Sequence, residues 1–141
     1  SVVGYRLPDD AATDSFDMLP AMLGTQDPKT SIRPHLLTQS FRGEFQLRQG
    51  NWKYCDHPGS GGNNYSKGPL LKYAIADHAP DAPGQLYDLE RDPGETTNLF
   101  DEQEAKRIEM KTLLERLKTS GRSAPINRLP IGIANIPKLQ S

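Results

Sequence analysis

The sequence predicts an α+β fold, in which a small antiparallel sheet of about four strands carries a C-terminal amphipathic helix on one face. Strand-like alternation of apolar and polar residues occurs between residues 35 and 54, and a further short strand is expected at 85–89. A helical stripe of apolar residues then follows at 101–120. Because the strands and the helix occupy separate parts of the chain, an α+β arrangement is expected.

The chain is expected to fold as a single domain with a linker before it and a tail after it. Its 141 residues, 35% of them apolar, can form one modest hydrophobic core. Residues 1–13 show little periodicity and are interpreted as a linker, and residues 14–121 are predicted to form the domain. Prolines interrupt residues 122–141, which are therefore expected to be an extended tail.

The first predicted element is a short helix before a loop at 24–34. Asp14 or Ser15 can accept a hydrogen bond from the first free backbone amides of this helix. Pro20 is unfavourable inside a longer helix, so only two irregular turns are expected. The apolar face consists of Phe16, Leu19 and Leu23.

A β-hairpin is predicted in the middle of the chain. A strand-like segment at 35–41 precedes an alternating segment at 44–48. Gly50-Asn51 then suits a two-residue turn that requires positive backbone angles, and Trp52 and Tyr54 resume the alternation on the return strand.

The second half of the chain begins with a loop and ends with a helix. Residues 56–69 are rich in glycine, proline and asparagine and are expected to form a long, exposed loop, whereas 70–76 fits a strand or a helix equally well. Asp101 and Glu104 have the spacing of a reciprocal capping pair for the final helix, which Gly121 is expected to end. Its apolar stripe consists of Met110, Leu113, Leu114 and Leu117, with Ile108 close by.

An acidic run at 88–95 precedes this helix. It lacks the alternating acidic pattern and the central glycine of a calcium loop, so a structural role is preferred. Asp92 is expected to fix the turn before Pro93, and Asn98 or Glu95 to satisfy free backbone amides nearby.

Composition and charge argue against two classes of partner. The net charge of −1 provides no attraction to nucleic acid or acidic lipid. No apolar run approaches the ~20 residues that cross a bilayer. We therefore expect neither nucleic acid nor a membrane as a partner. Residues 1–7 lack the pattern of a secretory signal, so the signal of an exported protein would lie outside this chain.

The residue types that usually carry chemistry do not form a recognisable set. His35, His57 and His78 lie in three different segments without metal-ligand spacing, so exposed or loop positions are expected for them. Cys55 is the single cysteine and has no identifiable base partner, so a partly buried apolar role is expected. Gly59–Gly62 lacks the spacing of a phosphate-binding loop.

Basic side chains gather between residues 31 and 53 and leave two interpretations open. Cationic groups there would suit a sulfate or carboxylate ligand. Alternatively, they are the solvated face of a half-buried sheet, which the alternation of Arg48 with Phe45 and Leu47 favours. The basic residues are Arg33, His35, Arg42, Arg48 and Lys53.

Three ordered blocks resemble the C-terminal region of the arylsulfatase-like sulfatases. The first is D-S-F-D-M-L-P-A-M-L-G at 14–24, and the second is the hairpin F-Q-L-R-Q-G-N-W-K-Y at 45–54. The third, at 86–99, joins an L-Y-D-L strand to D-P-G-E-T-T-N-L. With a G-R-S ending at 121–123, the resemblance runs from about residue 10 to 124.

The resemblance implies a sulfuric ester hydrolase whose catalytic residues precede this region. Such enzymes use a formylglycine made within C/S-x-P-x-R and a calcium ion held by Asp and Asn. Cys55 is followed by Asp-His-Pro-Gly and does not match. No catalytic residue or metal ligand is therefore assigned here, and calcium and formylglycine are expected only in the full-length enzyme. The family also implies a periplasmic or secreted location.

The expected partner is an N-terminal catalytic α/β domain, with a homo-oligomer as a further expectation. In the family the small C-terminal sheet packs on that domain and can shape the rim of the substrate pocket. The residues predicted for this rim are His35, Arg42, Arg48 and His57. The alternative function is a free-standing binding or interaction module derived from the same subdomain.

Overall fold

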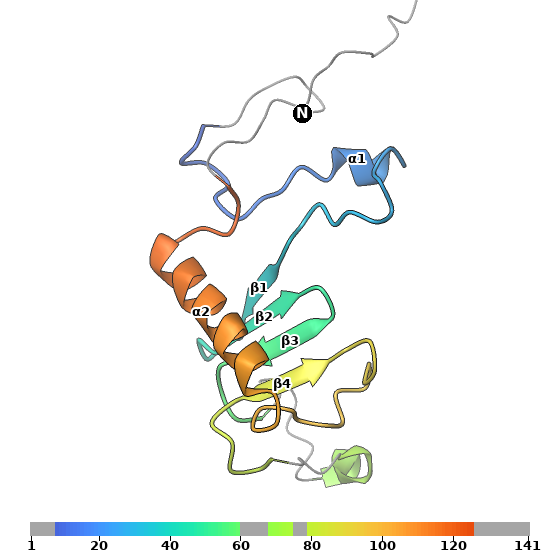
Figure 1. Ribbon diagram of the computed structural model, residues 1–141, viewed down its shortest axis with the longest axis vertical. Helices are drawn as coiled ribbons and strands as arrows, with labels where there is room; N and C mark the ends of the chain where they lie inside the picture. The colour runs from blue at the N-terminus through green and yellow to red at the C-terminus, as the bar shows by residue number, and fades with distance from the viewer. Residues whose placement is uncertain (1–7, 60–67, 75–78, 126–141) are drawn as a thin grey trace, which may run out of the picture. The chain divides into compact units, whose positions relative to one another are not determined.

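A computed structural model describes residues 8–59, 68–74 and 79–125 (Figure 1). This part of the chain divides into two compact units. One unit extends from Pro34 to Ser120. The other combines residues 8–33 with residues 121–125 of the described chain. Residues 126–141, which include most of the predicted tail, lie outside the described part of the chain, as does His78.

The larger unit contains a four-stranded antiparallel sheet in the order β1-β2-β3-β4, as predicted. The strands are β1 (Leu36–Gln39), β2 (Phe45–Gln49), β3 (Trp52–Cys55) and β4 (Gln85–Asp88). The predicted hairpin is confirmed, because Gln49 pairs with Trp52 across a two-residue turn. Gly50 adopts a φ of 57° there, a conformation that favours glycine.

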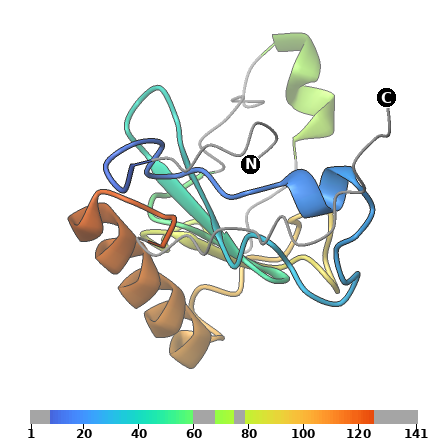
Figure 2. The same cartoon turned by 90° about the horizontal axis from the view of Figure 1, so that it is seen from above.

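The core lies between one face of this sheet and the helix α2 (Glu104–Ser120) (Figure 2). One side chain from each strand forms a row across the sheet on that face, namely Leu37, Leu47, Tyr54 and Leu86. The helix contributes the predicted stripe of Met110, Leu113, Leu114 and Leu117, all buried. Ile108, in contrast, is 55% exposed. The predicted α+β architecture is thus confirmed.

Cationic side chains of α2 add specific contacts to this interface. The ammonium of Lys106 lies 5.7 Å from the ring centre of Trp52, and that of Lys118 lies 5.2 Å from the ring centre of Phe45. Lys118 also lies 3.0 Å from a carboxylate oxygen of Glu115. The aliphatic stems of such residues can cover apolar surface while the charged ends remain near water.

Two predicted helix starts are wrong. Helix α2 begins at Glu104, so Gln103 and not Asp101 occupies the position before it. Gly121 follows the helix with a φ of 63°, as expected for its end. Helix α1 (Leu19–Met22) is a single turn whose first amide donates to Asp17, not to Asp14 or Ser15.

The segment around residues 70–76, for which a strand and a helix were equally expected, contains a 3-10 helix, η1 (Gly68–Tyr73).

In the smaller unit, the G-R-S segment bonds to residues near the beginning of the chain. The guanidinium of Arg122 donates to the carbonyl of Asp9 at 2.9 Å, and the amide of Ser123 donates to a carboxylate oxygen of Asp14 at 2.7 Å. Asp14 thus binds the C-terminal part of this unit instead of capping α1.

Candidate functional site

Asp92 organises the loop between β4 and α2. Its carboxylate accepts hydrogen bonds from the amides of Thr96 and Thr97, both at 2.7 Å, and from the hydroxyl of Thr96 at 2.9 Å. Charge-assisted bonds of this kind hold a turn in one conformation. Asp92 thus has a structural role, as predicted, but its side chain fixes the segment after Pro93 and not the turn before it.

Asn98 joins this loop to the sheet. Its buried side-chain oxygen accepts from the amide of Leu86 at 3.0 Å and from that of Phe100 at 3.1 Å. Its side-chain nitrogen donates to the carbonyl of Gly84 at 3.2 Å. Because these three bonds are buried, Asn98 fixes the position of the segment that runs beside β4.

Glu95 connects the loop to the sheet face opposite α2. Its carboxylate lies 2.6 Å from the ammonium of Lys53, although both side chains remain partly exposed. Glu95 has a φ of 54°, which is uncommon for a residue other than glycine. The predicted alternatives of Asn98 and Glu95 are thus resolved: Asn98 binds amides, whereas Glu95 forms an ion pair.

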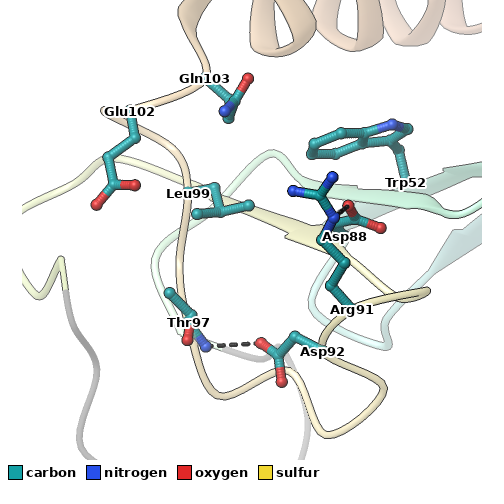
Figure 3. A pocket seen from close by; sticks show the side chains of 8 residues that line it. All are labelled: Trp52, Asp88, Arg91, Asp92, Thr97, Leu99, Glu102 and Gln103. Carbon is teal, nitrogen blue, oxygen red and sulfur yellow. Dashed lines mark hydrogen bonds and ion pairs between the residues drawn. The ribbon is translucent and has the colours of Figure 1, made fainter.

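The loop forms one wall of an open groove of about 590 Å³, shown in Figure 3. We call this the Trp52 groove. It lies beside the end of β4 and the residues that precede α2. Its lining residues are Trp52, Asp88, Arg91, Asp92, Thr97, Leu99, Glu102 and Gln103.

Some polar side chains of the groove already bond to other protein groups, whereas others are exposed to solvent. Asp88 lies 3.7 Å from the guanidinium of Arg91 and also accepts from the amide of Glu90. The side chain of Arg91 is 89% exposed, and Glu102 and Gln103 are exposed as well. Together with the indole of Trp52, these exposed polar groups form a surface that suits ligand binding.

The predicted rim residues do not gather in this groove or in any one place. Arg48 is exposed on β2, and its Cα partner in β1 is Leu36, the neighbour of His35. Arg42 is exposed in the β1–β2 turn, at the other end of β1. His35 and Arg48 therefore lie near the beginning of β1, and Arg42 lies beyond its end.

His57 occupies an unexpected environment. It follows β3 in a loop, as expected, but only 6% of its surface is exposed, so the expected exposed position is wrong. Its Nδ1 lies 3.2 Å from the carbonyl of Pro58, and within the described residues its Nε2 has no hydrogen-bond partner. Sequence spacing carries no signal for such burial.

Cys55 is buried in the sheet, as expected for a small apolar side chain. Burial raises the pKa of its thiol to about 11, because the protein interior disfavours the thiolate. Burial also raises the pKa of the neighbouring Tyr54 hydroxyl, and the Asp56 carboxylate acts in the same direction. Neither group is a nucleophile at neutral pH.

We expect the free energy of unfolding to fall as the pH rises from about 9 to about 11, because of the buried thiol of Cys55. The unfolded chain loses the Cys55 proton near the ordinary pKa of 9.0, whereas the folded protein retains it up to about 11. Deprotonation above pH 9 therefore favours the unfolded state. Urea unfolding of the wild type and of Cys55→Ala at a series of alkaline pH values measures how the free energy of unfolding of each protein changes with pH. Equal pH slopes for the two proteins would contradict the assignment to Cys55.

The described residues include no group of three or more His, Cys, Asp or Glu side chains placed to hold a metal ion. A buried Cys55 outside a C/S-x-P-x-R sequence likewise does not fit a formylglycine precursor. Across those residues, no helix has the length and apolar character needed to span a membrane.

Comparison with known proteins gives two informative matches. No family model matches the chain. It is 31% identical over 114 residues to the N-acetylgalactosamine-6-O-sulfatase of Bacteroides thetaiotaomicron, which covers 80% of this chain and 20% of that enzyme. A solved structure from work on the metabolism of multiple glycosaminoglycans by this bacterium has a TM-score of 0.59 and 29% identity, covering 84% of this chain and 22% of that one. The chain thus spans about one fifth of each relative.

Proposed function

Because this chain is related to sulfatases over most of its length, we propose that it is the C-terminal subdomain of an arylsulfatase-like sulfuric ester hydrolase. It completes the scaffold of that enzyme and contributes to the rim of the substrate pocket. The observation that carries the proposal is the 31% identity over 114 residues to an N-acetylgalactosamine-6-O-sulfatase. The substrate class proposed is a sulfated sugar.

In this proposal the catalytic residues, calcium and formylglycine belong to an N-terminal α/β domain. Exposed apolar side chains in the larger unit support the presence of a docking partner. Phe41 is 93% exposed in the β1–β2 turn, although that turn is held by hydrogen bonds in both directions between Ser40 and Glu44. Further exposed apolar residues are Leu36, Leu70, Leu71 and Tyr73.

The first test is an activity assay of the 141-residue chain. We expect no hydrolysis of 4-nitrophenyl sulfate or of N-acetylgalactosamine 6-sulfate above the blank, with or without added calcium. The full-length enzyme, assayed in parallel, should hydrolyse a sulfate ester. Turnover by the short chain would contradict the assignment of catalysis to another domain, and an inactive full-length protein would favour the free-standing module.

The second test concerns the rim. Replacement of Arg42 by alanine in the full-length enzyme should raise KM by roughly tenfold and leave kcat unchanged, since a guanidinium that binds substrate contributes to affinity. Arg116→Ala is the matched control, because Arg116 is also an exposed arginine but lies on α2. Equal KM values for wild type and Arg42→Ala would exclude Arg42 from the rim.

A further inference from the structure

We infer that the Trp52 groove binds an uncharged sugar ring. The inference rests on the chemistry of the lining residues and does not require the chain to be part of a sulfatase. It also differs from the proposed rim, since none of the predicted rim residues lines this groove.

Trp52 provides the apolar surface that a sugar ring needs. Its Cα partner in β4 is Asp88, and the ammonium of Lys106 lies 5.7 Å from the centre of its ring. The indole is therefore held between the sheet and α2 while it lines the groove (Figure 3). A fixed indole offers contact area at low conformational cost to a ligand with an apolar C–H face.

The exposed polar residues supply complementary hydrogen-bonding groups. The Arg91 guanidinium can only donate, the Glu102 carboxylate accepts, and the Gln103 amide does both. Adjacent hydroxyls of a sugar can donate and accept at the same time, so they can bond to all three types. Trp52 and Leu99 are the two apolar residues of an otherwise polar lining, which suits a polar ligand that has one apolar face.

The wall opposite Trp52 is preorganised. Asp92 already accepts bonds from the amides of Thr96 and Thr97 at 2.7 Å, so the loop does not need to order when a ligand enters. Leu99, which also lines the groove, is held in place because its amide donates to the carbonyl of Leu86 at 2.8 Å. Less ordering on binding leaves more of the contact energy available as affinity.

The charge of the lining selects against anionic sugars. Asp88, Asp92 and Glu102 are carboxylates, whereas Arg91 is the single cation among the lining residues. A sulfate or a uronic acid carboxylate in the groove would lie near this excess of negative charge. A neutral hexose or N-acetylhexosamine avoids that repulsion.

The chain carries its own probe for this site, because Trp52 is its single tryptophan. We would titrate the chain with N,N′-diacetylchitobiose and with lactose and record Trp52 emission. A saturable change with a dissociation constant on the order of 1 mM is expected. A disaccharide of chondroitin 6-sulfate should bind at least about tenfold more weakly. Flat titrations with both neutral sugars, measured to about 100 mM, would overturn the inference.

Variants then test the location. Gln103→Ala and Arg91→Ala should each weaken neutral-sugar binding by roughly tenfold, and both residues are exposed, so folding should be retained. Ile108→Ala is the control, because Ile108 is exposed on α2 outside the groove. Equal weakening in the control, unchanged affinity in both groove variants, or tighter binding of the sulfated disaccharide or of spermine would overturn the inference.

Discussion

Replacement of Leu114 by alanine is expected to lower the free energy of unfolding by about 2–5 kcal/mol. Leu114 is fully buried and belongs to the cluster formed by α2 and the sheet row that includes Leu47 and Tyr54. Its truncation removes apolar contacts and leaves a cavity that the close-packed neighbours can fill only in part. The strands limit collapse because their cross-strand hydrogen bonds fix their spacing.

Ile108→Ala is the matched control for this prediction. It removes a branched aliphatic side chain from the same helix, but Ile108 is 55% exposed, so a change below about 0.5 kcal/mol is expected. Urea unfolding monitored by circular dichroism measures both variants. A change below about 0.5 kcal/mol for Leu114→Ala would mean that α2 does not pack on the sheet through this residue.

Replacement of Asn98 by alanine is expected to lower the free energy of unfolding by about 2–4 kcal/mol. The substitution removes the acceptor of the Leu86 and Phe100 amides and the donor to the Gly84 carbonyl. Asn98 is only 5% exposed, so water cannot easily replace it as a partner. Buried groups that lose a partner carry their full desolvation cost.

The neighbourhood of Asn98 leaves little room for repacking. A Cβ at Gly84 would lie 2.7 Å from the carbonyl oxygen of Cys55 and 2.7 Å from the ring of Phe100. Asn51→Ala is the control, since Asn51 is exposed and its side chain bonds only to the Glu90 carboxylate in the described structure. Urea unfolding should show a much smaller effect for this control. Equal effects of the two variants would contradict the role given to Asn98.

Local sequence was sufficient for the hairpin and for the end of α2. Gly50-Asn51 between two alternating segments specifies a two-residue turn, and the turn fixes the register of β2 against β3. Gly121 ends α2 because its positive φ is costly for most other residues. In both cases the determinants lie within a few residues of the feature.

The starts of the helices were not predictable in the same way. The spacing of Asp101 and Glu104 suits a capping pair, but the amide of Gln103 bonds to the carbonyl of Leu99 and forms a separate turn before α2. Asp14 has the right position to cap α1, yet it accepts from the amide of Ser123. The side chain of Asp14 thus bonds to a residue far away in the sequence, which a local capping pattern does not reveal.

The sequence by itself determined the α+β class, the hairpin and the amphipathic stripe of α2, and it showed the resemblance to sulfatases. These follow from periodicity, turn chemistry and ordered motifs, all of which are local. Only the tertiary structure decided the burial of His57, the bonds of Asn98 and the composition of the Trp52 groove. The physical reason is that each depends on segments far apart in the chain: Trp52 and Gln103 line one groove because sheet pairing and the β4–α2 loop bring them together.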